Sequence, residues 1–201
     1  QELVEKDFNG PARVSGSAGT GKTIVALHRA VYLARQNTES RVLLTTFTES
    51  LANALKEKLK HLIGNTPRLA ERLEIHSMDA IALRLHKFNS EKKQLLSRDQ
   101  LFEIVSKYAN DVSDLRYSKA FVFEEWSQLV DAWQLTTWDE YRDVRRLGRK
   151  TRLAEAQRQI LWSIYEKVYA ELQSTNSVSI AGIYLDLTQS LSVNDNSPYD
   201  F

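Results

Sequence analysis

A glycine-rich segment near the N-terminus constrains the fold of this chain more than any other feature. Its residues are Gly16, Ser17, Ala18, Gly19, Thr20, Gly21, Lys22 and Thr23, which match the Walker A pattern G-x-x-x-x-G-K-[ST] in full. Glycines let the backbone turn tightly, so that N–H groups and the positive end of a following helix face one anion. The Lys22 ammonium can neutralise β- and γ-phosphate charge, and the Thr23 hydroxyl can coordinate Mg²⁺. The segment therefore predicts a nucleoside triphosphate site.

The residues around this loop alternate between patterns typical of strands and of helices. Short apolar runs predict strands at 12–15, 41–47 and 73–76, and the second run has the continuous apolar character of a buried parallel strand. Apolar residues at spacings of three and four predict helices over 22–36 and 51–63. Because strands and helices alternate, we expect an α/β fold with a parallel sheet.

From about residue 88 the pattern becomes helical. No convincing strand lies between 88 and 173, and apolar residues at helical spacing predict helices near 101–108, 123–133 and 153–172. We therefore expect an all-α subdomain inserted into the α/β domain, followed by one more helix near 185–191. The expected domains are 1–88, 89–178 and 179–201, the last returning towards the α/β domain.

Composition excludes several classes of protein. The chain has no cysteine, which excludes a disulfide scaffold, a zinc–thiolate site and a cysteine nucleophile. The formal net charge of +1 excludes a strongly basic tail protein and an acidic disordered one. No apolar run approaches the roughly 18 residues that a membrane span requires. We expect no membrane partner and a cytoplasmic location.

Three segments of the chain resemble the N-terminal part of the UvrD/Rep-like superfamily 1 DNA helicases. They are 16–35, 43–48 and 75–80, which fall where that family has its Walker A loop, motif Ia and motif Ib. The resemblance covers 1–88 well, and a helical insertion before the Walker B strand is also similar to this family. It implies a P-loop NTPase of RecA-like fold that uses ATP and Mg²⁺ and acts on single-stranded or forked DNA. The chain would then be the ATP-binding portion of an ATP-dependent DNA helicase or translocase.

The resemblance also implies roles for individual residues. The loop from Gly16 to Thr23 would hold the triphosphate, with Lys22 on the γ-phosphate and Thr23 on the magnesium. Gln1 lies one residue short of the place where the family has an adenine-reading glutamine. The residues implied to contact DNA are Thr46, Phe47 and Thr48 of motif Ia, and Ser77 and Asp79, which stand where motif Ib usually has Thr and His.

The physical interpretation of motif Ia leaves two alternatives open. Phe47 at a strand end offers a stacking face for a base or sugar, and the flanking hydroxyls of Thr46 and Thr48 can bond phosphate or sugar. Alternatively, Phe47 ends a buried strand and packs inward.

Hydrolysis of a triphosphate also needs carboxylates that hold magnesium and activate water. The candidates nearest to an apolar strand ending in Asp-Glu are Phe121–Glu125 and Asp139-Glu140, and we interpret both as ordinary surface carboxylates. In the family, the Asp-Glu strand follows shortly after the helical insertion. We therefore expect a fragment cut just before Walker B, with little or no ATPase activity by itself.

Several other groups of residues have both a functional and a structural interpretation. The arginine-rich stretch 142–158 either touches duplex phosphates or forms a locally paired helix boundary. Trp126 and Trp133 share a predicted helix face and are expected in the core. The lysines at 56, 58 and 60 are expected to be surface residues, and the histidines at 28, 61, 76 and 86, which show no metal spacing, are expected to be structural.

Two alternatives to a helicase motor remain from the residues alone. A P-loop kinase would use the basic stretch 142–158 as a lid over the phosphates, although it would not explain Thr46-Phe47-Thr48. A nucleotide-gated binding module would bind ATP and DNA without turnover.

Overall fold

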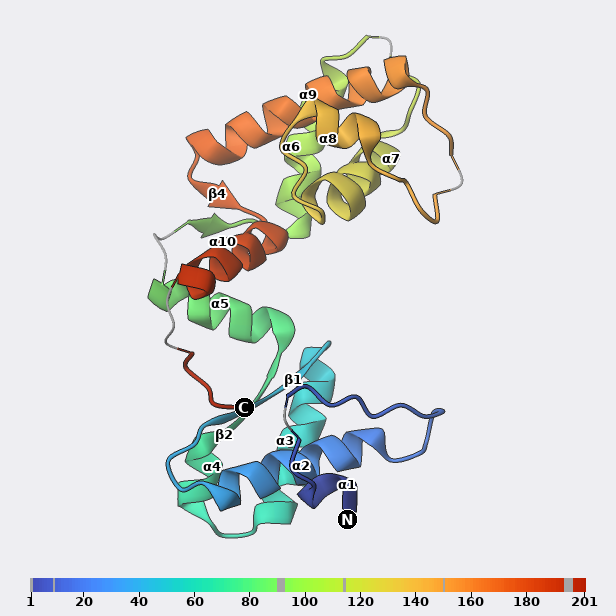
Figure 1. Ribbon diagram of the computed structural model, residues 1–201. Helices are drawn as coiled ribbons and strands as arrows, with labels where there is room; N and C mark the ends of the chain where they lie inside the picture. The colour runs from blue at the N-terminus through green and yellow to red at the C-terminus, as the bar shows by residue number, and fades with distance from the viewer. Residues whose placement is uncertain (1, 9, 90–92, 114, 150, 194–196) are drawn as a thin grey trace. The chain divides into compact units, whose positions relative to one another are not determined.

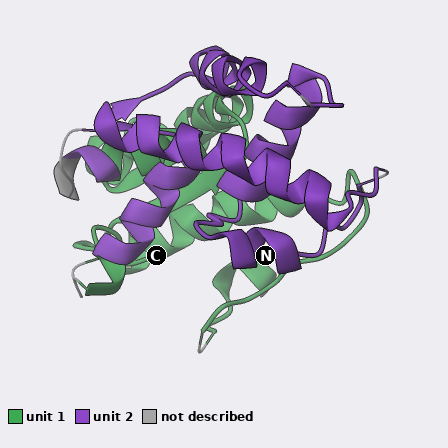
Figure 2. Ribbon diagram, turned by 90° about the horizontal axis from the view of Figure 1, so that it is seen from above, with its two compact units in different colours: residues 1–85, 191–201 green, residues 86–190 purple. Residues whose placement is uncertain are grey.

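The computed structural model describes residues 2–8, 10–89, 93–113, 115–149, 151–193 and 197–201 (Figure 1). The chain divides into two compact units, one formed by 1–85 with 191–201 and the other by 86–190 (Figure 2). The segment 179–201 is thus shared between the two units. The assignment of 1–88, 89–178 and 179–201 as domains stays a prediction.

The first unit holds a two-stranded parallel sheet. Strand β1 (Val42–Thr46) pairs with β2 (Leu73–Ser77) in a register that sets Val42 opposite Leu73. This confirms the parallel arrangement expected for these two runs. The helices of this part of the chain are α1 (Glu2–Glu5), α2 (Lys22–Gln36), α3 (Glu49–Ile63), α4 (Pro67–Arg72) and α5 (Met78–Asn89).

Local sequence signals explain where the two longer helices begin and end. Gly21 precedes α2 in the left-handed region, with φ of 82°, which favours glycine. Thr48 caps α3 because its side chain accepts a hydrogen bond from the Leu51 backbone N–H, and Gly64 ends α3 with φ of 59°. The apolar faces of α2, α3 and α4 then pack with the two strands into one core. That core contains Leu27, Ala30, Val31, Ala34, Val42, Ala52, Leu55, Leu59, Ile63, Leu69, Leu73 and Ile75.

The expected strand at 12–15 does not form. Residues 11–17 have no regular secondary structure and are exposed, although the glycine turn and α2 follow as predicted. An extended segment becomes a strand only when a neighbour accepts its backbone hydrogen bonds. The ladders among the described residues pair β1 only with β2, and β3 only with β4, so none reaches this segment.

The last described residues lie along the other edge of β1. The backbone N–H of Phe201 donates to the carbonyl of Arg41 at 3.4 Å, and the N–H of Leu43 donates to the carbonyl of Phe201 at 2.8 Å. These two bonds flank Val42 in the pattern of a parallel bridge. The position next to β1, on the side away from β2, is therefore occupied by residues 200–201.

The second unit is mainly helical. Its elements are α6 (Arg98–Asn110), α7 (Lys119–Glu125), the π-helix η1 (Trp126–Asp131), α8 (Trp138–Asp143), α9 (Glu155–Ser174), and most of α10 (Ile180–Val193). The long helix α9 packs against α6 and α8, as Figure 1 shows. The core combines buried aliphatic residues with large aromatic ones, among them Trp126, Tyr141, Trp162 and Tyr165. The rings of Tyr141 and Trp162 stack with centroids 5.7 Å apart.

The prediction that the inserted subdomain is all-α is wrong, because the second unit also contains two short strands. Strand β3 (Gln94–Leu95) pairs in parallel with β4 (Ser177–Val178), which joins the two ends of this unit. Runs of two residues carry no periodic signal, so sequence patterns could not reveal them.

The expectation that Trp126 and Trp133 share a buried face is wrong for Trp133. Trp126 is fully buried, whereas Trp133 is 69% exposed. The π-helix η1 begins at Trp126, and its wider turn shifts the angular position of every following residue relative to an α-helix. A seven-residue spacing that would align two α-helical side chains therefore separates these two.

Candidate functional site

The loop from Gly16 to Lys22 has a backbone suited to an anion. Gly19 and Gly21 have φ of 81° and 82°, in the region that side chains other than glycine rarely adopt. Gly16 is needed for a different reason, because a Cβ at this position would lie 2.8 Å from the Thr20 hydroxyl oxygen. The Thr20 hydroxyl in turn donates to the carbonyl of Ser17 at 2.9 Å. The backbone geometry of the turn therefore explains why glycine occupies positions 16, 19 and 21.

The Lys22 side chain folds back over the loop. Its Nζ donates to the carbonyls of Gly16 at 2.9 Å and Ser17 at 2.6 Å. The ammonium therefore lies against the first residues of the loop, which are expected to surround a phosphate. A triphosphate would exchange these neutral acceptors for anionic oxygens, which form stronger charge-assisted bonds.

Thr23 and Thr46 line one cavity with Lys22. The cavity has a volume of about 480 Å³ and is bounded by the start of α2, the end of β1 and part of α3. The structure thus brings the predicted magnesium ligand close to the end of the motif Ia strand. Ser77 and Asp79 do not line it. None of the described residues around this cavity is an aspartate or a glutamate.

Phe47 follows β1 and is 91% exposed. The inward-packing alternative for this ring is therefore wrong. Its two neighbours hold the turn: the Thr46 hydroxyl donates to the Thr48 carbonyl at 2.8 Å, and the Thr48 hydroxyl caps α3. The threonine hydroxyls are thus engaged within the protein, and the Phe47 ring is the group offered to solvent.

Ser77 and Asp79 are placed differently from each other. Ser77 is buried, and its hydroxyl donates to Glu49 Oε2 at 2.8 Å while accepting from the Ala80 backbone N–H at 3.3 Å. Asp79 is exposed in the first turn of α5. A DNA contact by Ser77 would have to compete with its bond to Glu49. An acidic residue such as Glu49 is common in the first turn of a helix, so its place at the start of α3 is predictable. Nothing in the sequence indicates that Ser77 is its partner.

A cluster of hydrogen bonds around Glu74 on β2 was not predicted from the sequence. Its carboxylate accepts from Arg41 at 2.7 Å, from the Tyr199 hydroxyl at 3.1 Å and from Arg84, and it lies 3.2 Å from His76 Nε2. Burial alone would raise the pKa of Glu74, but these donors lower it to about 2. The cluster ties β1, β2, α5 and the C-terminal segment together. An acid between Leu73 and Ile75 in a strand was its only sequence signal.

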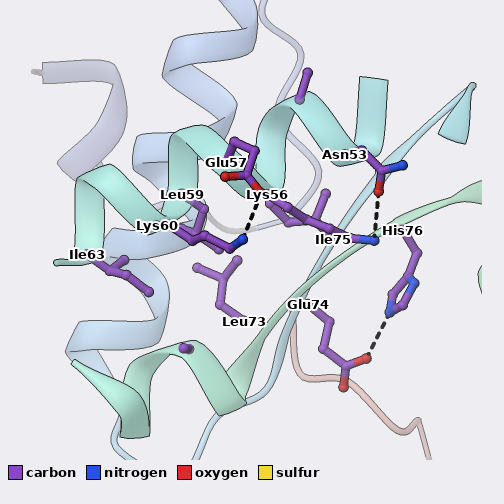
Figure 3. A pocket seen from close by; sticks show the side chains of 12 residues that line it. Asn53, Lys56, Glu57, Leu59, Lys60, Ile63, Leu73, Glu74, Ile75 and His76 are labelled. Atoms are coloured by element: carbon purple, nitrogen blue, oxygen red, sulfur yellow. Dashed lines mark hydrogen bonds and ion pairs between the residues drawn. The ribbon is translucent and has the colours of Figure 1, made fainter. Parts of the chain in front are cut away.

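Two lysines of α3, Lys56 and Lys60, lie beside a cavity of about 620 Å³ at the edge of β2, shown in Figure 3. Lys60 donates to Glu57 at 2.7 Å, and Lys56 donates to Asn53 at 3.4 Å. Exposed pairs of this kind contribute little to stability. Local pairing supports the surface interpretation of these two lysines, and Lys58 is likewise exposed.

Most arginines of the stretch 142–158 are bonded inside the second unit. Arg142 pairs with Asp139 and Asp143, and Arg158 donates to the carbonyls of Tyr141 and Arg142. Arg146 and Arg149 both lie within ion-pair distance of buried Glu125. Arg145 and Arg152 are exposed. Lys150 of this stretch and Gln1 lie outside the described residues. The locally paired interpretation is therefore favoured for four arginines.

The two Asp-Glu-like candidates lie in helices. Glu124 and Glu125 end α7, and Glu140 belongs to a capping box at the start of α8 with Thr137. Neither pair follows a strand, and Asp139 and Glu140 are exposed as predicted. The prediction of a surface carboxylate is wrong for Glu125, which is fully buried in its ion pair with Arg146. In the part of the chain that the structure describes, no helix is long and apolar enough to cross a bilayer.

One protein family matches the chain along most of its length, and individual known proteins match a shorter part of it. A family model described as the UvrD/REP helicase N-terminal domain matches residues 1–198. The ATP-dependent DNA helicase PcrA of Staphylococcus aureus is 36% identical over 86 residues, which is 42% of this chain and 12% of that protein. PcrA of Staphylococcus epidermidis is 35% identical over 86 residues with the same coverage. The match to these relatives thus spans only a small part of their length.

Proposed function

Because this chain belongs to the UvrD/REP helicase family, we propose that it is the ATP-binding portion of an ATP-dependent DNA helicase or translocase acting on single-stranded DNA. The observation that carries the proposal is the loop around Lys22, whose ammonium rests on the carbonyls of Gly16 and Ser17. The matching family model is described as a helicase domain, which favours a helicase over a P-loop kinase.

The roles of the loop residues follow from their positions. Gly16, Ser17, Ala18, Gly19, Thr20 and Gly21 supply the backbone that surrounds the phosphates. Lys22 contacts the γ-phosphate, and Thr23, at the N-terminal end of α2, holds Mg²⁺ with its hydroxyl. The left-handed Gly19 and Gly21 fit this group, because successive backbone N–H groups in such turns form concavities that bind anions. When bound, the magnesium neutralises developing charge on the phosphates.

The DNA path runs past the exposed Phe47 ring. Its exposure after β1 supports stacking on a base or sugar, and the neighbouring Thr46 and Thr48 fix the turn that presents it. Asp79 is a further exposed candidate, whereas Ser77 acts on DNA only if it releases Glu49. ATP binding would close two RecA-like lobes on this strand, and forked DNA is the substrate expected of the whole motor. We place the protein in the cytoplasm.

Turnover by the 201-residue chain should be weak. The described walls of the cavity beside Thr23 hold no carboxylate to complete a magnesium site or orient water. A nucleotide-gated binding module therefore describes the expected behaviour of this chain alone, and hydrolysis belongs to the proposed parent motor.

The experiment is a pair of binding titrations with matched variants. A fluorescent ATP analogue with Mg²⁺ should bind the unaltered chain and bind Lys22→Ala at least about 10-fold more weakly. A labelled oligothymidine should bind Phe47→Ala more weakly, by about 1–3 kcal/mol, with nucleotide binding unchanged. Nucleotide affinity that is unaffected by Lys22→Ala would exclude the proposed site.

A further inference from the structure

The second unit contains a pocket that no step of the proposed function uses. It has a volume of about 490 Å³ and is lined by residues of α6, α7, η1 and α10, together with Leu96, Ala132 and Ser179 next to these elements. Its wall is largely apolar and includes the rings of Phe123, Trp126 and Tyr184. All of its lining residues lie within 86–190, so the pocket belongs to this unit alone. Its size suits a small organic molecule.

One acidic side chain, Asp131, interrupts this apolar wall. Asp131 is buried at the end of η1, and its Oδ1 accepts from the Ser179 hydroxyl at 2.7 Å and from Gln134 Nε2 at 3.3 Å. No hydrogen bond reaches Oδ2 from the described residues, and no lysine or arginine among them forms an ion pair with Asp131. Burying a carboxylate without a cation is costly, so such groups are normally paired. Asp131 therefore lacks the partner that its charge requires.

The cationic residue of the pocket wall is already engaged elsewhere. Arg98 forms an ion pair with Glu124, and its guanidinium lies over the Phe123 ring at 4.8 Å. Two contacts thus already engage the Arg98 guanidinium. Among the described residues, the buried ion pairs nearby in the sequence use Glu125 and not Asp131.

The π-helix places Asp131 in this wall. An α-helix continued through 126–131 would set residue 131 at a different angle, whereas the wide turn of η1 brings Trp126, Ser127 and Asp131 onto the same pocket. Single π-helical turns occur frequently at functional sites because they rotate side chains out of helical register. The rare backbone, the unpaired carboxylate and the pocket thus coincide.

From this combination we propose that the pocket binds a small organic amine, with its ammonium on Asp131 Oδ2 and its apolar or aromatic body against Trp126 and Phe123. An alkylammonium supplies the missing cation and three N–H donors. Aromatic walls favour such a cation electrostatically as well as through apolar contact. The site is independent of the nucleotide loop, which lies in the other unit.

The probe is 2-phenylethylamine, titrated into the 201-residue chain by calorimetry. Its neutral isostere 2-phenylethanol has the same body with a hydroxyl in place of the ammonium, and we expect it to bind at least 10-fold more weakly. Asp131→Asn should bind the amine more weakly by the same factor, because its side-chain amide keeps an acceptor for Ser179 but carries no charge. The matched control is Asp111→Asn, which removes an exposed carboxylate outside the pocket and should leave affinity unchanged.

A second variant keeps the test informative if Asp131→Asn folds poorly. Ala181→Leu fills part of the pocket while leaving the carboxylate in place, and it should abolish amine binding.

A free amine and a lysine side chain both present an ammonium on an apolar chain. Nα-acetyl-lysine amide is therefore titrated as a second ligand, to distinguish these two sources of the ammonium. Preference for 2-phenylethylamine supports a free aromatic amine, and preference for the lysine derivative supports a lysine side chain. Equal binding of amine and alcohol, equal binding by Asp131→Asn, or no saturable binding would overturn the proposal.

Discussion

The side chains of Glu125 and Arg146 form a buried, two-pronged ion pair. Arg146 Nε lies 2.6 Å from Glu125 Oε1, and Arg146 Nη2 lies 2.8 Å from Oε2. Arg146 also donates to the carbonyl of Thr151, so that one guanidinium joins α7 to the segment between α8 and α9. The nearby hydroxyl of Tyr141 donates to the same carboxylate at 3.3 Å. Charge in this stretch therefore organises the helical unit from inside.

Breaking this pair should destabilise the chain strongly. Arg146→Ala leaves the buried Glu125 carboxylate with only the longer contact to Arg149, at 3.5 Å, and breaking a buried pair typically costs about 3–5 kcal/mol. The free energy of unfolding, measured by urea titration, should fall by that amount. Arg145→Ala is the control, because Arg145 is exposed and surface substitutions usually stay within about 0.5 kcal/mol. Equal effects of the two variants would show that Arg146 is not buried in an ion pair.

Tryptophan fluorescence should separate Trp126 from Trp133. Trp133→Phe removes an exposed indole and should leave stability within about 0.5 kcal/mol of the unaltered chain while shifting the mean emission to shorter wavelength. Trp126→Phe removes a fully buried one and should cost about 1–3 kcal/mol through lost packing. If iodide quenches Trp126→Phe and Trp133→Phe to the same extent, the register shift at η1 is wrong.

The two tryptophans also illustrate what sequence patterns can and cannot reveal. The glycine loop, α2, β1, α3 and β2 were predictable, because each has a local signal such as a capping residue, a glycine or an apolar run. The π-helix had none, since its hydrogen-bond pattern depends on packing around it rather than on residue type. The same holds for residues 12–15, whose strand-like composition lacks a paired neighbour.

Long-range pairing was equally inaccessible. Nothing local to Glu74 indicates that Tyr199, 125 positions away, donates to it. Nor does the composition of 142–158 reveal that Arg146 faces Glu125. The chemistry of the nucleotide loop could be predicted because its residues are contiguous, whereas the buried acids could only be assigned partners by the fold.

Stability should decrease at low pH through Glu74. Hydrogen bonds from Arg41, Arg84 and Tyr199 lower the pKa of Glu74 from 4.5 to about 2. The folded state thus binds fewer protons than the unfolded one, and this stabilisation is present above pH 4.5 and lost as the pH falls towards 2. The shift corresponds to at most roughly 3 kcal/mol. Glu74→Gln should be less stable than the unaltered chain at pH 6, and the difference should shrink at pH 3. A difference that is constant over this range would contradict the assigned pKa.

Asp131 should have the opposite pH dependence. Burial raises the pKa of Asp131 from 3.8 to about 6, so the folded state holds a proton that the unfolded state releases. Ionisation of Asp131 therefore destabilises the fold as the pH rises from about 4 through 6, by about 3 kcal/mol. Asp131→Asn should be more stable than the unaltered chain at pH 7.5 and close to it at pH 4, in unfolding titrations without added amine. Lower stability of Asp131→Asn at pH 7.5 would show that the carboxylate is well compensated.

Two glycines with similar positive φ angles allow the effect of the loop on nucleotide binding to be separated from the effect of backbone strain on stability. Gly21 and Gly148 have φ of 82° and 75°, and a Cβ at either would meet no atom within 4 Å. Alanine at each position should therefore cost a similar amount, about 1–2 kcal/mol, through strain alone. Only Gly21→Ala should also weaken binding of the fluorescent ATP analogue, because Gly21 immediately precedes Lys22 in the turn. Since Gly148 lies in the other unit, Gly148→Ala should bind nucleotide as the unaltered chain does. A parallel loss of nucleotide binding in both variants would mean that general destabilisation, rather than the shape of the loop, controls affinity.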